Sequence, residues 1–407
     1  MESALEAMAN ISVRILAWLA FLCLASTASH AQIPDVLCNE GSGSFEAAFH
    51  TGVKVRVGAA KKGGLATRLC EAAVSWDQQN ELVATDAFQL DVDAFGVDLG
   101  VGVPVVAFQV KKSRPDCCMA YQIHSLQKPS RLLRTITGGD FFSAADIDLD
   151  GRVEIWSHDA AAVDGFETLV LGELDAPPTI VLRFEQSRLI DVSSEFQTYF
   201  DSEIAKIREK IGQLDLLDFK SSNGALTPPT AFSAEQLHRL RRVKARVLEI
   251  VWSYLYSGRE QEAWRSLAEM WPAADVERVR VAILDGRTHG IRAQVDGVST
   301  VGPNGKKKRV ALFDATSSSQ PNKSEITSSR PIQLRRPPTS LTLPESELLL
   351  DLVIDSAGKV RSAEPSGKTK WPDADLLGAT AGWKFIPAFK GNRPVASRSR
   401  LAVSLAR

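Results

Sequence analysis

One short segment carries the residues whose types and spacing are best suited to chemistry. Asp146, Asp148 and Asp150 occupy every second position, and Arg152 and Glu154 continue the same spacing. When such a loop curls, the three aspartates converge, and the carbonyl oxygen of Arg152 and the carboxylate of Glu154 complete a shell of hard oxygens, the ligands that Ca²⁺ prefers. The five residues therefore predict a calcium site. The ion would be structural, because it would offset carboxylate repulsion and fix the turn.

The flanks of this loop distinguish it from the best-known calcium motif. An EF-hand continues to a bidentate Glu at loop position twelve, where this chain has Ser157. A strand-like run, 153–156, instead follows at once. Residues 135–165 thus resemble the calcium loop of FG-GAP repeats, the integrin-type propeller blades, and the resemblance implies that Asp146, Asp148, Asp150 and Glu154 are side-chain ligands. There is no second copy, so a full propeller is not expected. The alternative is an Asp-rich turn that holds no metal.

The rest of the sequence lacks the familiar catalytic motifs. It has no Gly-x-Ser-x-Gly elbow, no His-Glu-x-x-His, no Walker loop and no Gly-x-Gly-x-x-Gly that opens a helix. Histidines 50, 124, 158, 238 and 289 are scattered. We therefore predict a protein without catalytic activity. Catalytic groups that lie far apart in a sequence escape such a search, so an enzyme acting on envelope polymers is an alternative.

The N-terminus has the layout of a secretory signal peptide. Arg14 precedes an apolar run, 15–25, and small residues lead up to Ala31. The run is shorter than the roughly 20 apolar residues that a membrane span needs. We predict a signal peptide over residues 1–31, cleavage after Ala31, and an exported, periplasmic chain without a stable transmembrane span.

Four cysteines remain after this cleavage, and export permits disulfides. Adjacent residues of a strand point to opposite faces, so we expect Cys117 and Cys118 to have different partners or to stay partly unpaired. A Cys38–Cys70 bridge beside an adjacent Cys117–Cys118 pair is the alternative.

Residues 32–198 read as a mainly antiparallel β domain. Alternating or continuous apolar runs predict strands near 53–57, 104–110, 119–123 and 179–184, with turn residues between them. Such a series of short strands is typical of a meander, a sandwich or part of a propeller.

From residue 199 to 295 the apolar period becomes helical. Ser233 and Gln236 form a capping-box pattern ahead of a long apolar stripe, and Gly258 separates it from a second helix over 260–271. This arrangement predicts a small helical bundle. The alternative is a tetratricopeptide-type hairpin, but only one copy is present and such repeats need neighbours.

A basic segment follows at 296–343. It is rich in Ser, Pro and Lys and poor in apolar residues, so we predict a flexible linker. From Pro303 to Arg407 there are 18 Lys and Arg against 9 Asp and Glu, giving +9 here and −10 elsewhere. This excess favours a solvated linker over binding to an anionic surface, and in an exported chain we expect no nucleic-acid partner.

The last segment, 344–407, has the order β-β-α-β. Its most specific pieces are Val353-Ile354-Asp355 with Gly358-Lys359-Val360, and Trp383-Lys384-Phe385-Ile386-Pro387-Ala388 with Gly391 and Pro394-Val395. These pieces resemble the C-terminal domain of the TonB family, in which a small sheet binds partner proteins by strand addition. The resemblance covers residues ~330–407 and implies contact with an outer-membrane receptor or another envelope protein.

The final strand is the expected place of that strand addition. Free backbone groups on a sheet edge are a template for an incoming strand. The residues that we expect along this edge are Val395, Ser397, Ser399, Leu401 and Val403.

Together these features predict an α+β multidomain protein with a β domain, a helical region, a basic linker and a TonB-like module. We expect an exported, non-catalytic protein-binding protein linked to TonB-dependent transport across the envelope. The family's extended spacer and uncut membrane anchor are missing here. For this reason a membrane-anchored transducer of the TonB type is the alternative and not the leading prediction.

Overall fold

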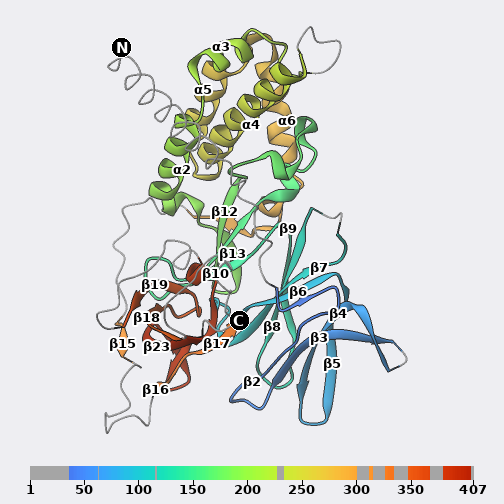
Figure 1. Cartoon of the computed structure of the whole chain (residues 1–407), viewed down its shortest axis with the longest axis vertical. Helices are drawn as coiled ribbons and strands as arrows, with labels where there is room; N and C mark the ends of the chain where they lie inside the picture. The colour runs from blue at the N-terminus through green and yellow to red at the C-terminus, as the bar shows by residue number, and fades with distance from the viewer. Residues whose placement is uncertain are drawn as a thin grey trace, which may run out of the picture. The chain divides into compact units, whose positions relative to one another are not determined.

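The computed structural model describes residues 36–62, 64–114, 117–226, 233–299, 311–314, 326–333, 347–366 and 379–404. It contains both helices and several sheets, so the fold is mixed α+β as expected (Figure 1). The predicted signal peptide lies outside the described residues. Among the helices in these ranges, none is both long enough and apolar enough to cross a membrane.

The N-terminal part contains two antiparallel sheets. One has the order β1-β6-β7-β8-β9 and the other the order β2-β3-β4-β5. The strands of the first sheet are β1 (Cys38–Asn39), β6 (Gln89–Val97), β7 (Val105–Lys111), β8 (Met119–Ser125) and β9 (Leu132–Gly139). Those of the second are β2 (Phe45–Ala48), β3 (Lys54–Lys62), β4 (Leu65–Trp76) and β5 (Gln79–Ala87). The strands predicted near 53–57, 104–110 and 119–123 are thus confirmed.

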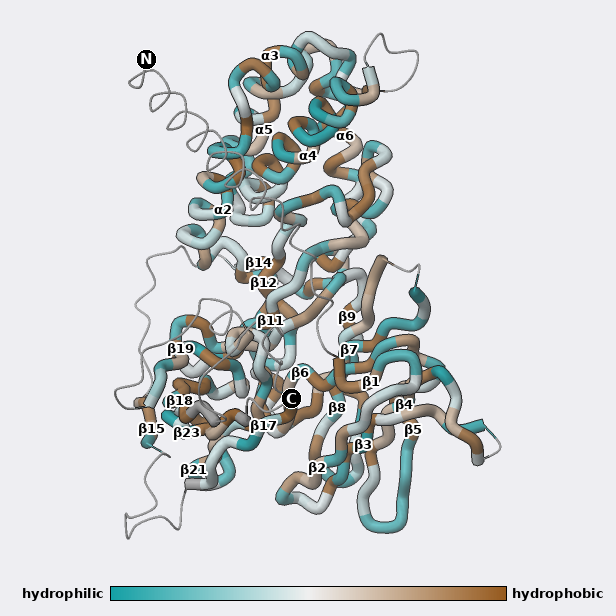
Figure 2. The backbone as a smooth tube through the Cα atoms, in the orientation of Figure 1, coloured by the Kyte–Doolittle hydropathy of each residue, from teal (hydrophilic) through white to brown (hydrophobic). Residues whose placement is uncertain are grey.

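Strand β7 shows why the first sheet is buried on both faces. Val106 and Phe108 pack into a core shared with the second sheet, which makes this part a sandwich. Val105 and Ala107 point the other way, into a core formed mainly with residues between 121 and 291. Successive side chains of a strand alternate between faces, so a strand apolar on both faces reads as a continuous hydrophobic run. Figure 2 shows this hydrophobic character along β6 and β7.

A third sheet follows, with the order β10-β11-β12-β13-β14. Its strands are β10 (Ser143–Ala145), β11 (Glu154–His158), β12 (Thr179–Glu185), β13 (Arg188–Asp191) and β14 (Gly297–Val298). Strand β14 comes from the predicted linker and pairs with β13 in parallel. The carboxylate-rich loop connects β10 to β11, so a two-stranded antiparallel pair fixes both of its ends.

Five helices pack on this sheet through one shared core. They are α2 (Gln197–Glu209), α3 (Gln213–Lys220), α4 (Ala234–Tyr256), α5 (Glu260–Met270) and α6 (Val276–Gly286). The capping box is confirmed, because the Ser233 side chain accepts from the N–H of Gln236 and the Gln236 side chain accepts from the N–H of Ser233. Gly258 adopts a φ of +80° between α4 and α5, a conformation that glycine takes without strain. After α6 the chain returns to the sandwich, where Gln294 bonds the backbone of Thr137 in β9.

The C-terminal part adds three small sheets. Their orders are β15-β23-β18-β19, β16-β21-β22 and β17-β20 (Figure 1). The strands are β15 (Phe313–Asp314), β16 (Ile326–Thr327), β17 (Arg330–Gln333), β18 (Glu347–Ile354), β19 (Val360–Pro365), β20 (Lys384–Ile386), β21 (Ala388–Lys390), β22 (Arg393–Val395) and β23 (Ser397–Ser404). Most of the helix expected over 373–380 lies outside the described residues. The described parts of 296–343 supply β14 to β17, each paired with a strand elsewhere.

This C-terminal part shares core contacts with the N-terminal sandwich. Ile386 belongs to the core cluster between the two sandwich sheets. Phe389 lies 5.9 Å from Phe49, measured between ring centroids. The described residues of 344–407 therefore make apolar contacts with the β domain.

Candidate metal centre

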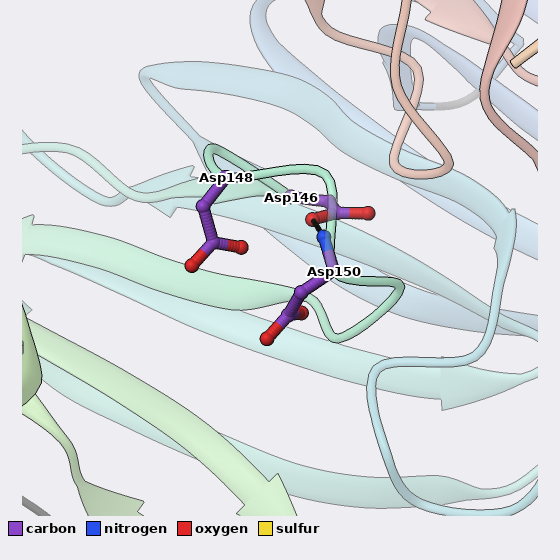
Figure 3. Close-up of side chains that lie close together, drawn as sticks. All are labelled: Asp146, Asp148 and Asp150. Carbon is purple, nitrogen blue, oxygen red and sulfur yellow. Dashed lines mark hydrogen bonds between the residues drawn. The ribbon is translucent and has the colours of Figure 1, made fainter. Parts of the chain in front are cut away.

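The loop between β10 and β11 brings the three predicted aspartates together. Asp146, Asp148 and Asp150 each present a carboxylate oxygen, and these oxygens lie within 4.8 Å of one another (Figure 3). Asp146 is fully buried, and the other two are half-buried. The spacing of the sequence thus predicted the convergence of the three aspartates, and the group that the structure brings together does not include Glu154.

Asp146 holds the loop in its curled form. Its Oδ1 accepts the N–H of Asp150 at 2.9 Å, the contact dashed in Figure 3, and its Oδ2 accepts the N–H of Gly151 at 3.0 Å. Leu149 and Gly151 both adopt positive φ, +56° and +87°. Glycine takes this conformation easily, whereas Leu149 pays a steric cost that the surrounding hydrogen bonds must offset.

Glu154, the fourth predicted carboxylate ligand, is not in the group of three aspartates that converge, but it is poorly satisfied. Its side chain is 1% exposed, Oε1 lies 3.4 Å from Nη1 of Arg183, and Oε2 has no hydrogen-bond partner among the described residues. Burial, and then repulsion from Asp148, raise the pKa of Glu154 to about 8. Burial also raises the pKa of Asp146 to about 6. A cation here would stabilise the ionised form of both carboxylates and so lower their pKa values.

Two guanidinium groups already contact the carboxylates. The Arg152 side chain donates to Oδ2 of Asp150, at 2.8 Å from Nε and 2.6 Å from Nη2. These bonds involve the side chain only, whereas the predicted ligand of Arg152 is its backbone carbonyl. Arg183 is 3% exposed and pairs with Glu195 and Glu185 as well as Glu154. The arginines offset part of the acidic charge but leave Glu154 Oε2 without a donor. Hard carboxylate oxygens and this orphaned buried atom fit Ca²⁺.

A turn from the C-terminal part reaches the same loop. The N–H of Asp146 donates to Oδ2 of Asp355 at 3.1 Å, and the Ser356 hydroxyl lies 3.3 Å from Oδ2 of Asp146. Asp355 is fully buried and also accepts the N–H groups of Ala357 and Lys359. Gly358 has a φ of +83°, and a Cβ at that position would meet the carbonyl oxygen of Phe385 at 1.9 Å, so the tight turn requires glycine.

A buried ion pair holds the other side of this turn. Nζ of Lys359 lies 2.5 Å from Oδ1 of Asp93 and 2.7 Å from its carbonyl oxygen. The second carboxylate oxygen of Asp93 accepts the Tyr121 hydroxyl and the N–H of Ala144. Both ionised groups are thus paired and hydrogen-bonded, as buried charges must be. The sequence analysis missed this pair, although a charge inside the apolar run of β6 was a signal that it needs a partner.

The five residues expected on the open edge do not lie on one strand. Val395 is in β22 and pairs with Ala388, which corrects the expected start of the last strand. Ser397 pairs on both sides, with Ile354 of β18 and Phe313 of β15. The other three residues, Ser399, Leu401 and Val403, pair with β18 on one side only within the part of the chain that the structure describes.

The four cysteines form two disulfides, Cys38–Cys70 and Cys117–Cys118. The expectation that Cys117 and Cys118 have different partners is therefore wrong. Its physical basis does not apply, because both residues precede β8, which begins at Met119, and so do not alternate across a strand.

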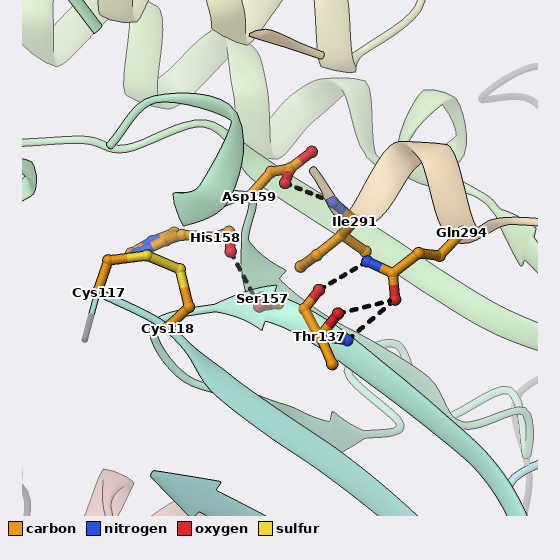
Figure 4. Close-up of a disulfide and its surroundings, with 8 residues drawn as sticks. All are labelled: Cys117, Cys118, Thr137, Ser157, His158, Asp159, Ile291 and Gln294. Carbon is orange, nitrogen blue, oxygen red and sulfur yellow. Dashed lines mark hydrogen bonds between the residues drawn. A yellow bond between two sulfur atoms is a disulfide. The ribbon is translucent and has the colours of Figure 1, made fainter. Parts of the chain in front are cut away.

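Figure 4 shows the adjacent pair with His158 among its surroundings. The ring of His158 is held by Oδ2 of Asp140, 3.0 Å from Nδ1.

The loop thus gathers one buried and two half-buried aspartates, whose oxygens are ligands that a hard cation prefers. It also shares hydrogen bonds with the turn at Asp355 and Ser356. No family model, no curated protein and no solved structure matches this chain.

Proposed function

We propose that this is an exported, periplasmic protein-binding protein without catalytic activity, in which a Ca²⁺ ion at the carboxylate loop stabilises the docked position of a TonB-like C-terminal module. The ion would be held by the side chains of Asp146, Asp148, Asp150 and Glu154 and the carbonyl of Arg152. The module would bind an envelope protein by strand addition, in a process linked to TonB-dependent transport.

The observation that carries the proposal is the contact between the loop and the module. Asp146 is a candidate ligand, and both its N–H and its carboxylate bond the turn at Asp355 and Ser356. A cation that fixes Asp146 therefore also fixes the turn between β18 and β19. The sheet then presents the outer side of β23, where described strands pair only at Ser397 and Arg398. Free N–H and C=O groups on such an edge can accept a partner strand.

Two measurements test the two parts separately. Calorimetric titration of the metal-free full chain with Ca²⁺ should show saturable binding that the substitution Asp146→Asn abolishes. Equal affinities for the two proteins would exclude the proposed site.

For partner binding, a photo-cross-linking residue replaces Ala402, which is exposed on β23, and in a matched control replaces Leu65, which is 77% exposed on the β3–β4 hairpin. A discrete envelope-protein adduct is expected from position 402 alone. Identical adducts from both positions would argue against the edge.

The N-terminus of the purified protein distinguishes the export proposal from the anchored transducer. A mature chain that begins at Gln32 supports export with cleavage. An intact Met1 in the membrane fraction would instead favour the transducer.

A further inference from the structure

A second site candidate lies among the helices, away from the carboxylate loop. A cleft of about 540 Å³ opens where α4 ends, α5 begins and the chain leaves α6. Its lining includes Leu255, Gly258, Glu260, Arg287, Arg292 and Ala293. This volume lies in the range of small-molecule sites, roughly 300–1,000 Å³.

Arg287 is the residue that points to a ligand. It follows α6 directly, and its guanidinium lies 5.4 Å from the ring centroid of Tyr256. Its Nε is buried and has no hydrogen-bond partner, and no carboxylate forms an ion pair with it among the described residues. Stacking on a ring satisfies the face of a guanidinium but not its N–H groups. A buried donor without an acceptor costs free energy, and Arg287, which carries this donor, is one of the residues that line the cleft.

The neighbouring charged groups already have partners. Arg292 forms an ion pair with Asp191. Asp159 is fully buried and accepts the Tyr256 hydroxyl, the N–H of Ile291 (Figure 4) and the N–H of Arg292. Burial and repulsion from Arg292 lower the pKa of Arg287. Among the described residues that line the cleft, Arg287 is therefore the cation with a buried N–H group, at Nε, that has no acceptor.

Glu260 is the acidic residue that lines the same cleft, and its carboxylate would repel an anionic ligand. It is exposed at the first position of α5, and its Oε1 accepts the indole N–H of Trp264 at 3.0 Å. Its carboxylate is thus directed along its own helix and forms no ion pair with Arg287. A ligand in the cleft would have to tolerate this charge, so removal of the charge should strengthen binding.

We propose that this cleft binds a small organic anion through a carboxylate or phosphate group, with Arg287 as the principal contact. Arg292 adds positive charge beside it, and Leu255 and Ala293 provide apolar surface for the body of the ligand. The two oxyanions share the chemistry that a guanidinium recognises, namely acceptor oxygens that take charge-assisted hydrogen bonds.

The test is calorimetric titration of the full chain at constant ionic strength, in buffer freed of metal by a chelating resin. The absence of calcium makes the result independent of the proposed metal site. The probes are inorganic phosphate and, separately, succinate, which distinguish the two sources of the oxyanion. We expect saturable 1:1 binding of at least one probe. Arg287→Met should weaken it at least about tenfold, the loss of one charge-assisted hydrogen bond.

Three further variants make the outcome decisive. Arg280→Met removes an arginine that stacks on Trp264 from the exposed face of α6, and it should leave binding unchanged. Glu260→Gln should tighten binding severalfold. Arg287→Lys keeps the charge without the planar fork and should bind with intermediate affinity, and together with Glu260→Gln it provides the test if Arg287→Met does not fold. No saturable binding of either probe, or equal affinity of folded Arg287 variants and the unaltered chain, would overturn the proposal.

Discussion

Burial and the neighbouring carboxylates both raise the pKa of Glu154. The resulting pKa is about 8, because the Arg183 guanidinium offsets only part of the increase. The folded protein therefore holds a proton that the unfolded chain, with an ordinary value of 4.5, releases earlier. The contribution of Glu154 to stability without metal is thus fully present below about pH 4.5 and is lost as the pH rises towards 8. Calcium should remove this loss, because it binds the ionised form.

Glu154→Gln should therefore stabilise the metal-free protein at pH 8, by on the order of 2 kcal/mol, since the amide needs no proton to be neutral. The same change should abolish the stabilisation by Ca²⁺. Urea unfolding at pH 5 and pH 8, with and without calcium, measures both effects. Glu185→Gln is the control, because it removes a half-exposed partner of Arg183 outside the loop. A calcium response that survives in Glu154→Gln would remove this residue from the ligand set.

The turn between β18 and β19 is the element that joins the two halves of the candidate site. Its tip contacts the carboxylate loop through Asp355, and its exit places Lys359 against Asp93. A buried ion pair leaves an uncompensated charge when one partner is removed, whereas an exposed pair contributes little. The C-terminal part offers both kinds, since Arg400 of β23 pairs with Asp351 of β18 where both side chains are more than a third exposed.

Lys359→Met should accordingly destabilise the protein by about 3–5 kcal/mol, the usual cost of breaking a buried pair. Arg400→Met should cost less than about 1 kcal/mol. Chemical denaturation of both variants in parallel gives the comparison. Adding Asp93→Asn to Lys359→Met should recover part of the loss, because the unpaired charge is then gone. Equal effects of the two single substitutions would show that Lys359 is solvated in solution.

The two disulfides should differ in how much they stabilise the fold. Cys38–Cys70 joins β1 to β4, 32 residues apart, and so links strands of the two sandwich sheets. Cys117–Cys118 closes a ring between neighbours and restricts the unfolded chain little. Replacing Cys38 and Cys70 by Ser should cost about 3–4 kcal/mol. The same change at Cys117 and Cys118 should cost much less, and a larger loss there would point to a native-state role. Thermal unfolding of the two double variants measures the difference.

At the scale of the whole molecule, what the sequence predicted correctly was local. The carboxylate loop, the capping box at Ser233 and the strand at β7 each follow from spacing within a few residues. The contacts of the C-terminal part with the β domain do not, because Asp146 and Asp355 are 209 positions apart and Asp93 and Lys359 are 266 apart. Periodicity carries no information over such distances. The available signal was chemical, namely an aspartate, Asp93, in the apolar run of β6, which needs a partner.

These long-range contacts give the last prediction. If Ca²⁺ stabilises the docked position of residues 344–407, then by linkage those residues must strengthen Ca²⁺ binding by the same factor. A chain that ends at residue 343 should therefore bind Ca²⁺ more weakly, about 5–150-fold for coupling of ordinary size. It should also unfold at a lower temperature, because Asp93 and Asp91 lose Lys359 and Lys384.

Calorimetric titration and thermal unfolding of the shortened and full chains measure the two quantities. The full-length variant Arg400→Met, altered on the exposed face of the module, serves as the control and should keep its calcium affinity. An unchanged affinity in the shortened chain would show that the module and the loop are independent. In that case Asp146 would bind its ion without help from Asp355, and the module would have to be held against the β domain by its buried lysines and apolar contacts alone.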